Sequence, residues 1–385
     1  MGARPAAAPS RARPASPAKV AASPGKAYPL LFVTSLALVL IGLVMILSAS
    51  SVEAYKQYGS SFLFFYRQTV GVFIGLFAMV ILARMDYRKL RRIARPLFIL
   101  CIILLGAVLV PGISVTRAGS SRWLDIGLLT FQPSELAKLS LIMFCATALA
   151  GKETAIRDIR EMAIPVLPAA GILAMLVMAQ PDLGTTIICL GCAFVVVFLA
   201  GAQMKHLAAL AGVGGLCIAG LALSEGYRRA RLFSFFDPWA DPLNSGYHII
   251  QGQIAFGSGG WFGLGLGASR QKWSYVPNAH TDFIYAILGE ELGLMGTLTV
   301  LLLFGLVLAL GIRIAKSAPD RFGFLLAGGI TGWIGLQALV NMGAVSGLLP
   351  ITGVPLPLIS FGGSSLVFTL AAIGILLSIA KRGRA

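Results

Sequence analysis

The sequence predicts an all-α polytopic membrane protein with about ten transmembrane helices, and three observations support this fold class. Hydrophobic residues make up 57% of the 385 residues and charged residues only 12%, whereas a soluble domain carries about 25% charged residues. The mean hydropathy is +0.85. Apolar runs of about 17–25 residues, the length that crosses a bilayer, recur along the chain between polar stretches.

Residues 1–27 differ from everything that follows. They are rich in Ala, Pro, Ser and basic residues and have no apolar core, so we expect a disordered basic cytoplasmic tail. The next apolar run is more than 20 residues long and further spans follow it, which argues against a cleaved signal peptide. Residues 28–385 then form a ten-helix membrane domain, with spans expected at 29–50, 66–84, 97–113, 134–150, 162–179, 185–201, 207–223, 283–312, 322–345 and 364–380.

The positions of Lys and Arg predict the orientation. With both termini in the cytoplasm, 21 basic residues fall on the inner side and nine on the outer side, and Lys138 alone lies within a span. Because inner loops are enriched in Lys and Arg, this distribution favours an even number of spans with both ends inside. The formal net charge of +16 therefore reflects topology, and we expect no nucleic-acid partner.

Three long connections fall on the outer side of this topology. They are 114–133, 224–282 between spans seven and eight, and 346–363. Long structured loops usually carry function. We therefore expect the chemistry of this protein on the outer face of the membrane.

The stretch 271–293 contains the strongest candidate for a catalytic group. His280 and Asp282 stand at the start of a long apolar helix, where an unpaired carboxylate is costly and is therefore a functional hypothesis. A structural alternative is that Asp282 is an N-cap or first-turn acid, stabilised by the helix dipole. His280 is a second candidate for a base, since the ordinary pKa of histidine suits neutral pH.

Charged residues in and before the fourth span form a second candidate group. Glu135 and Lys138 are three residues apart and share a helix face, so they are either an ion pair that fixes packing or the charged wall of an outward-facing cavity. Arg122 precedes Trp123 in the loop before this span. Its guanidinium can bind phosphate oxygens in pairs, and headgroup contact is the alternative.

The last span begins with Gly362, Gly363 and Ser364. A helix N-terminus binds anions through its free N–H groups and its positive dipole end, so these residues are candidates for holding a phosphate. An ordinary serine cap is the alternative. The glycine run 257–267 follows no strand of a βαβ unit, and we interpret it as loop geometry rather than a dinucleotide site.

Five motifs in order make the chain resemble a known family. They are SRW before FQPSELAKL, QPDLGTT at 180–186, DPWADPLNSGYHIIQ at 237–251, the stretch 263–293, and LLPITGVPLPLISFGGSS at 348–365. Over residues 28–382 the sequence resembles the SEDS proteins (shape, elongation, division and sporulation), and it is most like their FtsW branch. Phe361 departs from the pattern, because family members commonly have Tyr there.

The resemblance implies a peptidoglycan glycosyltransferase in the bacterial inner membrane, at the division septum. Its substrate would be lipid II, a disaccharide-pentapeptide on undecaprenyl pyrophosphate. A class B penicillin-binding protein and other membrane proteins of the divisome would be its partners. The family's essential acid falls on Asp282.

This implied reaction inverts the anomeric carbon, so we expect a single displacement with Asp282 as general base. The candidates for neutralising the leaving pyrophosphate are Arg122, Lys138, Arg270 and Lys272, and Glu135 would orient Lys138. A divalent cation, Mg²⁺ or Mn²⁺, could assist, and Glu135 would alternatively help to hold it; the sequence leaves the metal and its site open.

Three other functions remain open at this point. A lipid II flippase would use the buried pair Glu135 and Lys138, as transporters do. A scaffold for division proteins would not need Asp282 for chemistry. An elongation polymerase of the RodA branch would catalyse the same reaction elsewhere in the cell.

Overall fold

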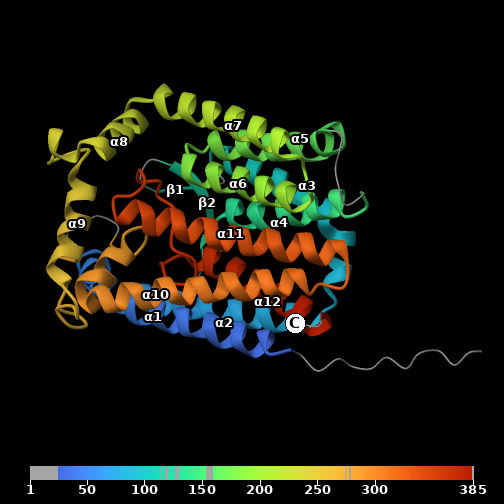
Figure 1. The fold of residues 1–385 in the computed structure, drawn as a ribbon. Coiled ribbons are helices and arrows are strands. Elements are labelled where there is room, and N and C mark those ends of the chain that lie inside the picture. Colours follow the sequence, from blue (N-terminus) through green and yellow to red (C-terminus); the bar gives the residue numbers. More distant parts are fainter. Residues whose placement is uncertain are drawn as a thin grey trace, which may run out of the picture.

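The chain folds into a bundle of helices (Figure 1). The computed structural model describes residues 25–112, 114–117, 120–125, 130–152, 159–273, 275–276 and 279–383, so the expected tail 1–27 lies almost wholly outside the described residues. Each of the ten expected spans coincides with a helix. These helices are α1 (Ala27–Tyr58), α2 (Leu63–Arg84), α3 (Leu90–Val108), α4 (Pro133–Leu149), α5 (Ile159–Met178), α6 (Leu183–Leu199), α7 (Met204–Ser224), α10 (Ile284–Lys316), α11 (Arg321–Val345) and α12 (Gly363–Arg382).

The connections contain structure that the hydropathy pattern did not predict. The long connection 224–282 holds two further helices and a 3-10 turn, and the one before α4 holds a small antiparallel sheet in the order β1-β2-β3. The elements of these two connections are β1 (Val115–Arg117), β2 (Ser120–Asp125), β3 (Thr130–Phe131), α8 (Gly226–Phe236), η2 (Pro238–Ala240) and α9 (Tyr247–Gly259). A further 3-10 turn, η1 (Tyr87–Lys89), lies between α2 and α3.

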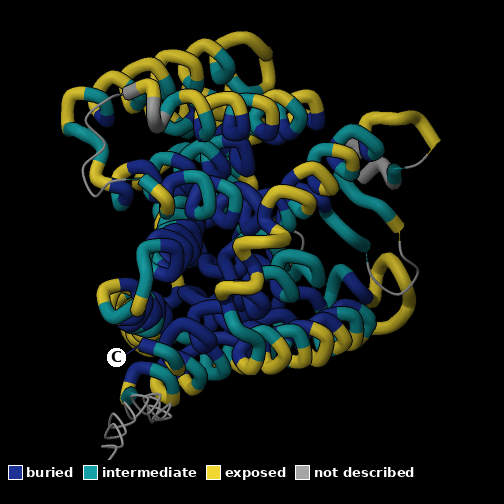
Figure 2. Tube along the Cα trace, turned by 90° about the vertical axis from the view of Figure 1, so that its right-hand side faces the viewer, coloured by how far each residue is buried: buried dark blue, intermediate teal, exposed yellow. Residues whose placement is uncertain are grey.

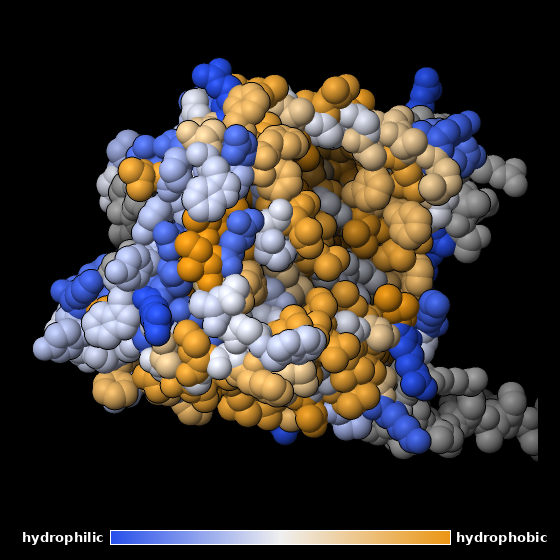
Figure 3. Space-filling view, turned by 60° about the vertical axis from the view of Figure 1, so that its left-hand side comes forward, coloured by the Kyte–Doolittle hydropathy of each residue, from blue (hydrophilic) through white to orange (hydrophobic). Residues whose placement is uncertain are grey.

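Length and composition identify six of the described helices as candidate membrane spans, namely α1, α2, α7, α10, α11 and α12. Helices α5 and α6 contribute shorter apolar segments. Helix α3 begins among arginines, and α4 carries Glu135 and Lys138. Figure 3 shows hydrophobic surface across the middle of one face, with hydrophilic residues on both sides of it. The helices are those of a multi-pass membrane protein, while the number of ten crossings stays a prediction.

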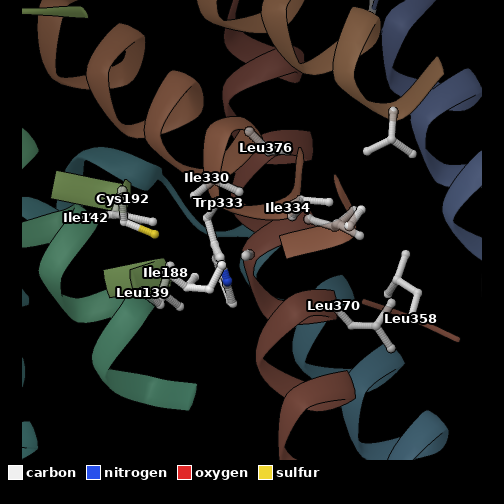
Figure 4. Close-up of a cluster of buried hydrophobic side chains, with 14 of the residues drawn as sticks. Leu139, Ile142, Ile188, Cys192, Ile330, Trp333, Ile334, Leu358, Leu370 and Leu376 are labelled. Carbon is white, nitrogen blue, oxygen red and sulfur yellow. The ribbon is translucent and has the colours of Figure 1, made fainter. Parts of the chain in front are cut away.

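The centre of the bundle is formed by α4, α6, α11 and α12. Trp333 of α11 is 1% exposed and lies among Leu139, Ile188 and Ile330 (Figure 4). Helix α7 differs, because Leu207 is its one buried residue and most of its surface faces outward (Figure 2). The core of the bundle is therefore closely packed, whereas α7 lies at the edge of the bundle.

Helix α10 is kinked at Gly293, whose φ of 67° is in the left-handed region that favours glycine. The glycine run 257–267 pairs with the backbone on both sides of this kink. Leu264 donates its N–H to the Glu290 carbonyl at 2.9 Å, and Leu294 donates to the Gly260 carbonyl at 2.9 Å. The run is thus loop geometry fitted to α10, as its sequence context predicts.

Polar contacts join the α2–α3 turn, the start of α11 and the end of α12 at one end of the bundle. The distribution of Lys and Arg predicts that this end faces the cytoplasm. The Tyr87 hydroxyl and the Arg88 guanidinium both donate to Asp320 Oδ2, at 2.6 and 2.9 Å. Asp320 Oδ1 accepts the Gly323 N–H at 2.8 Å and so caps α11. A second pair, Arg382 with Asp86 at 3.6 Å, joins the end of α12 to the same turn. The α2–α3 turn is therefore fixed to α11 and α12.

Candidate active site

A cavity of about 1530 Å³ opens at the end of the bundle where α1 ends and α4, α6 and α12 begin. Helix α8 and the segment before α10 complete its wall. Its charged lining comes from segments far apart in the sequence, and includes Arg67, Arg122, Glu135, Asp182, Arg231 and Asp282. The structure thus brings four of the predicted polar motifs to one site.

Asp282 lies in this cavity immediately before α10. The N-cap of α10 is Phe283, no side chain caps the helix, and its first turn holds no acid. The interpretation of Asp282 as a capping or first-turn residue is therefore wrong. The Asp282 side chain is left available to the cavity.

The surroundings of Asp282 make it a suitable base. Burial raises the pKa of Asp282 to about 6, Arg231 and Arg122 act in the opposite direction, and Asp182 adds to the rise. At neutral pH the carboxylate is ionised. Its proton affinity is nevertheless much higher than that of a solvated aspartate, which is the condition that general base catalysis requires.

His280, expected as a substrate-binding residue or an alternative base, lies in the cavity wall among aromatic rings. Its ring stacks on Phe64 with the centroids 4.7 Å apart and meets the edge of Phe361 at 5.6 Å. Burial lowers the pKa of His280 to about 4, so the imidazole is neutral at pH 7. His280 lines the cavity as part of an aromatic cluster and is a poorer base than Asp282.

Glu135 and Lys138 form the expected ion pair. Lys138 Nζ donates to Glu135 Oε1 at 2.9 Å and to Gln337 Oε1 at 2.8 Å, and it lies 5.1 Å from the Trp333 ring centroid. Both side chains are almost fully buried. Glu135 lines the cavity, whereas the described lining does not include Lys138. Lys138 therefore neutralises Glu135 from behind the cavity wall.

Arg122 lines the cavity but is already bonded on three sides. Its Nε donates to the Gln180 carbonyl at 2.8 Å, and one terminal nitrogen donates to the Pro181 carbonyl at 2.6 Å. The other terminal nitrogen pairs with Asp182 Oδ2 at 3.2 Å. Arg122 thus fixes the small sheet to the turn before α6, and only 21% of its side chain is exposed.

Arg270 and Lys272, which follow the glycine run, make their contacts mainly with that loop and with α10. Arg270 is exposed and lies outside the described cavity lining, and its backbone N–H donates to Glu290 Oε1 at 3.0 Å. Lys272 reaches the lining, but its ammonium donates to the Gly267 carbonyl at 2.6 Å and pairs with Glu291 at 3.4 Å. The contacts of Arg270 and Lys272 are therefore mainly with the loop and α10, and their expected role in substrate binding stays a prediction.

Three further arginines of the cavity lining, Arg67, Arg228 and Arg231, were not among the predicted site residues. Arg67 begins the second span and Arg231 lies on α8, and both line the cavity. Arg231 could have been found, because it belongs to a cluster of arginines in the connection 224–282. The sequence could not show that the fold of α8 places Arg231 in the same cavity as Asp282.

The start of α12 lines the cavity through Gly362, Gly363 and Ser364. The Ser364 hydroxyl donates to the Thr130 carbonyl at 2.6 Å and accepts the Gln132 N–H at 3.1 Å. The N-cap is Gly362, with no side-chain cap, so the serine-cap alternative is wrong. Ser364 holds β3 against α12, and the first backbone N–H groups of the helix face the cavity end.

The site does not fit a divalent cation held by protein ligands alone. Among the described residues, no three His, Cys, Asp or Glu side chains come together. Asp182, on the cavity wall with Asp282, is already occupied by Arg122 and by the Thr185 N–H at 3.0 Å. We therefore derive no step through a metal.

Comparison with known proteins agrees with this architecture. A family model described as "Cell cycle protein", covering FtsW, RodA and SpoVE, matches residues 28–385. Stage V sporulation protein E of Bacillus subtilis (strain 168) is 44% identical over 355 residues, which are 92% of this chain and 97% of that protein. The probable peptidoglycan glycosyltransferase FtsW of Geobacter metallireducens is 41% identical, across 90% of this chain and 93% of its own.

Two solved structures share the fold. A chain from a structure described as "Structural coordination of polymerization and crosslinking by a peptidoglycan synthase complex" has a TM-score of 0.76 and 33% identity. The rod shape determining protein RodA of Thermus thermophilus has a TM-score of 0.68 and 31% identity. Each comparison covers 92% of this chain and 97% of the other. The resemblance drawn from the five motifs is confirmed, and the chain belongs to the SEDS family, the cell-cycle proteins that include FtsW, RodA and SpoVE.

Proposed function

We propose that this chain is a peptidoglycan glycosyltransferase that polymerises lipid II into β-1,4-linked glycan strands. The observation that carries the proposal is the position of Asp282, a carboxylate of raised pKa in a 1530 Å³ cavity at the predicted outer end of the bundle. Relatives that cover about the whole chain are named probable peptidoglycan glycosyltransferases.

The proposed reaction is a single inverting displacement. The 4-hydroxyl of the acceptor GlcNAc attacks the anomeric carbon of the donor, and the bond from that carbon to the pyrophosphate oxygen breaks. The oxygen leaves with the bonding electrons. Asp282 takes the proton of the attacking hydroxyl, a role that typically contributes about 10²–10⁴-fold in rate.

The leaving pyrophosphate is stabilised by cations and backbone donors of the cavity. Arg67 and Arg231 line the cavity and stand close to the rings of Tyr58 and Tyr227. Among the described residues neither forms a salt bridge, so they suit this role better than Arg122, whose guanidinium is already bonded. The start of α12 adds N–H groups beside Gly363. Such preorganised charges act on the transition state more strongly than on the substrate.

The biological setting we propose is septal cell-wall synthesis with a class B penicillin-binding protein and other divisome membrane proteins. Relatives named FtsW support the division role over the elongation role. The similar chain from a peptidoglycan synthase complex supports a partner that crosslinks the strands.

A lipid II flippase is the second candidate, because the buried pair of Glu135 and Lys138 resembles the ion pairs of transporters. Alternating access requires the site to open to both sides of the membrane. The contacts of Asp320 with Tyr87 and Arg88 tie the far end of the bundle together, which favours a site that opens to one side.

The test is polymer formation by the purified protein with its class B partner and lipid II in detergent. Asp282→Asn keeps the size of the side chain but removes the base, so we expect polymer from the wild type and almost none from the variant. Asp241→Asn is the matched control, because it changes an acid of the same outer connection that lies outside the cavity lining.

Equal polymer from wild type and Asp282→Asn would contradict the assignment of the base. Absence of polymer from the wild type, in an assay that works with a known polymerase, would contradict the proposed activity. Exchange of lipid II between the leaflets of liposomes would then support the flippase.

A further inference from the structure

Three consecutive backbone carbonyls in front of α10 are each held by the C-terminal part of the chain. The His280 carbonyl accepts the Phe361 N–H at 2.9 Å, and the Thr281 carbonyl accepts the Ser360 hydroxyl at 2.6 Å. The Asp282 carbonyl accepts Asn341 Nδ2 at 2.8 Å. The sequence separations, from 59 to about 80 residues, show that these are tertiary contacts rather than local turn geometry.

Asn341 makes the most specific of these contacts. It lies in the last turn of α11 and is 2% exposed. Its Nδ2 donates both to the Asp282 carbonyl and to the Val354 carbonyl, each at 2.8 Å. An amide nitrogen carries two N–H donors, so this one side chain bridges two segments that no backbone ladder joins. Its own Oδ1 is buried without a partner.

Ser360 reinforces the bridge from the same loop. Its hydroxyl donates to the Thr281 carbonyl and also accepts the Leu356 N–H at 2.8 Å. The loop 350–361 is therefore folded on itself at the point where it meets the Asp282 segment. Gly353 of this loop lies beside the acid, because a Cβ built on it would stand 3.6 Å from Asp282 Oδ2.

These contacts matter because, in the described part of the chain, no hydrogen bond or ion pair holds the Asp282 carboxylate itself. Asp282 does not cap α10, and the structure shows no salt bridge to it among the described residues. The charged groups that face it, Arg231 from α8, Arg122 from β2 and Asp182 before α6, act through space. The place of the acid is set through its backbone.

We infer that Asn341 is a positioning residue for Asp282: it fixes the backbone of the acid and at the same time holds the loop that covers it. The inference rests on the proposed function. A misplacement of about 1 Å at a reacting group can cost about 10²-fold in rate, while the binding of distant parts of the substrate is unaffected. Loss of the bridge therefore acts on turnover rather than on substrate affinity.

The first measurement is hydrogen exchange by mass spectrometry on the protein in detergent, comparing wild type with Asn341→Leu. Leucine has a similar volume but no donors. We expect faster exchange in the peptides over 279–286 and 350–361 and unchanged exchange elsewhere. Thr331→Val is the matched control, since Thr331 is also buried in α11 but bonds only within its own helix, to the Ala327 carbonyl at 2.8 Å.

The second measurement is polymerisation by the same proteins with lipid II and the class B partner. We expect kcat to fall about 10–100-fold in Asn341→Leu with KM changed less than about threefold. The acid limb of the pH profile should move to lower pH, because water entering beside Asp282 removes part of the burial that raises its pKa. Thr331→Val should leave kcat, KM and the acid limb unchanged.

Ser360→Ala provides a milder variant if Asn341→Leu folds poorly, with the same pattern expected at a smaller size. Unchanged exchange over 279–286 in a folded variant would overturn the inference, and so would faster exchange with unchanged kcat. A wild type that makes no polymer would refute the proposed function, and the exchange data would still decide whether Asn341 holds the segment.

Discussion

Two acids of the same cavity wall, Glu135 and Asp282, have opposite surroundings. Glu135 has a bonded cation of its own, Lys138 at 2.9 Å, and that cation is held in turn by Gln337. Asp282 has no bonded cation among the described residues and senses Arg231 and Arg122 only through space. The two acids of this cavity thus differ in their partners, and Asp282, whose charge has no bonded cation, is the one we propose as the base.

The comparison predicts its largest effect at Asp282. Asp282→Asn should lower the rate of polymerisation by about 10²–10⁴-fold, because the amide cannot accept the proton of the attacking hydroxyl. Its thermal stability in detergent should equal or exceed that of the wild type, since a buried charge is removed. Single-turnover assays and a melting curve measure both quantities. A clear loss of stability would show that Asp282 is a structural acid like Glu135.

The next largest effect is expected on stability, at the other acid. Lys138→Met leaves the Glu135 carboxylate buried without a cation, and breaking a buried pair in this way costs about 3–5 kcal/mol. We expect a sharply lower melting temperature and poor yield from membranes. Adding Glu135→Gln to the same chain should recover most of the loss, because the remaining charge is then removed. No recovery in the double variant would contradict the pairing as the cause.

The pH dependence of activity tests the assignment of Asp282 as the base. Asp282 acts as a base only when it is ionised, and its pKa is raised to about 6. Activity should therefore be level above about pH 7 and fall tenfold per pH unit once the pH drops below about 6. A pH profile of kcat/KM measures this limb. A limb near pH 4, the ordinary range of aspartate, would mean that burial does not act on Asp282 as the structure indicates.

The smallest effect is expected from a cation that acts through space. Arg231→Gln removes a positive charge that favours ionised Asp282, so the acid limb should move upward by less than about one pH unit. A rise of a few-fold in KM for lipid II should accompany it if Arg231 also binds the pyrophosphate. Arg229→Gln, an exposed neighbour on α8 outside the cavity lining, is the matched control. Equal shifts in both variants would show that only the overall charge matters.

The helices could be predicted from the sequence because the bilayer imposes a length on them. All ten expected intervals contain a helix, and each boundary agrees to within several residues. The connection 224–282 could not be predicted in the same way. Its helices α8 and α9 have mixed polarity, and they are determined by tertiary packing rather than by a hydropathy run.

The site was predictable only in part for a related reason. The motif at Asp282 and the pair of Glu135 with Lys138 are local in the sequence, and the structure places Asp282 and Glu135 in one cavity. The roles of Lys272 and Arg231 depend on which segments meet in space. Lys272 is occupied by Glu291, 19 residues away, and Arg231 reaches the cavity by the fold of α8. Sequence spacing contains no signal for either contact.

The kink at Gly293 divides α10 into two mechanical parts. The short upper part, residues 284–292, follows Asp282 and is almost wholly buried, while the long lower part buries one side and exposes the other. The glycine run is bonded to both parts, to the Glu290 and Glu291 carbonyls above the kink and to the Leu294 and Met295 N–H groups below it. It therefore fixes the angle between the two parts, and with it the direction in which the segment carrying Asp282 leaves the long helix.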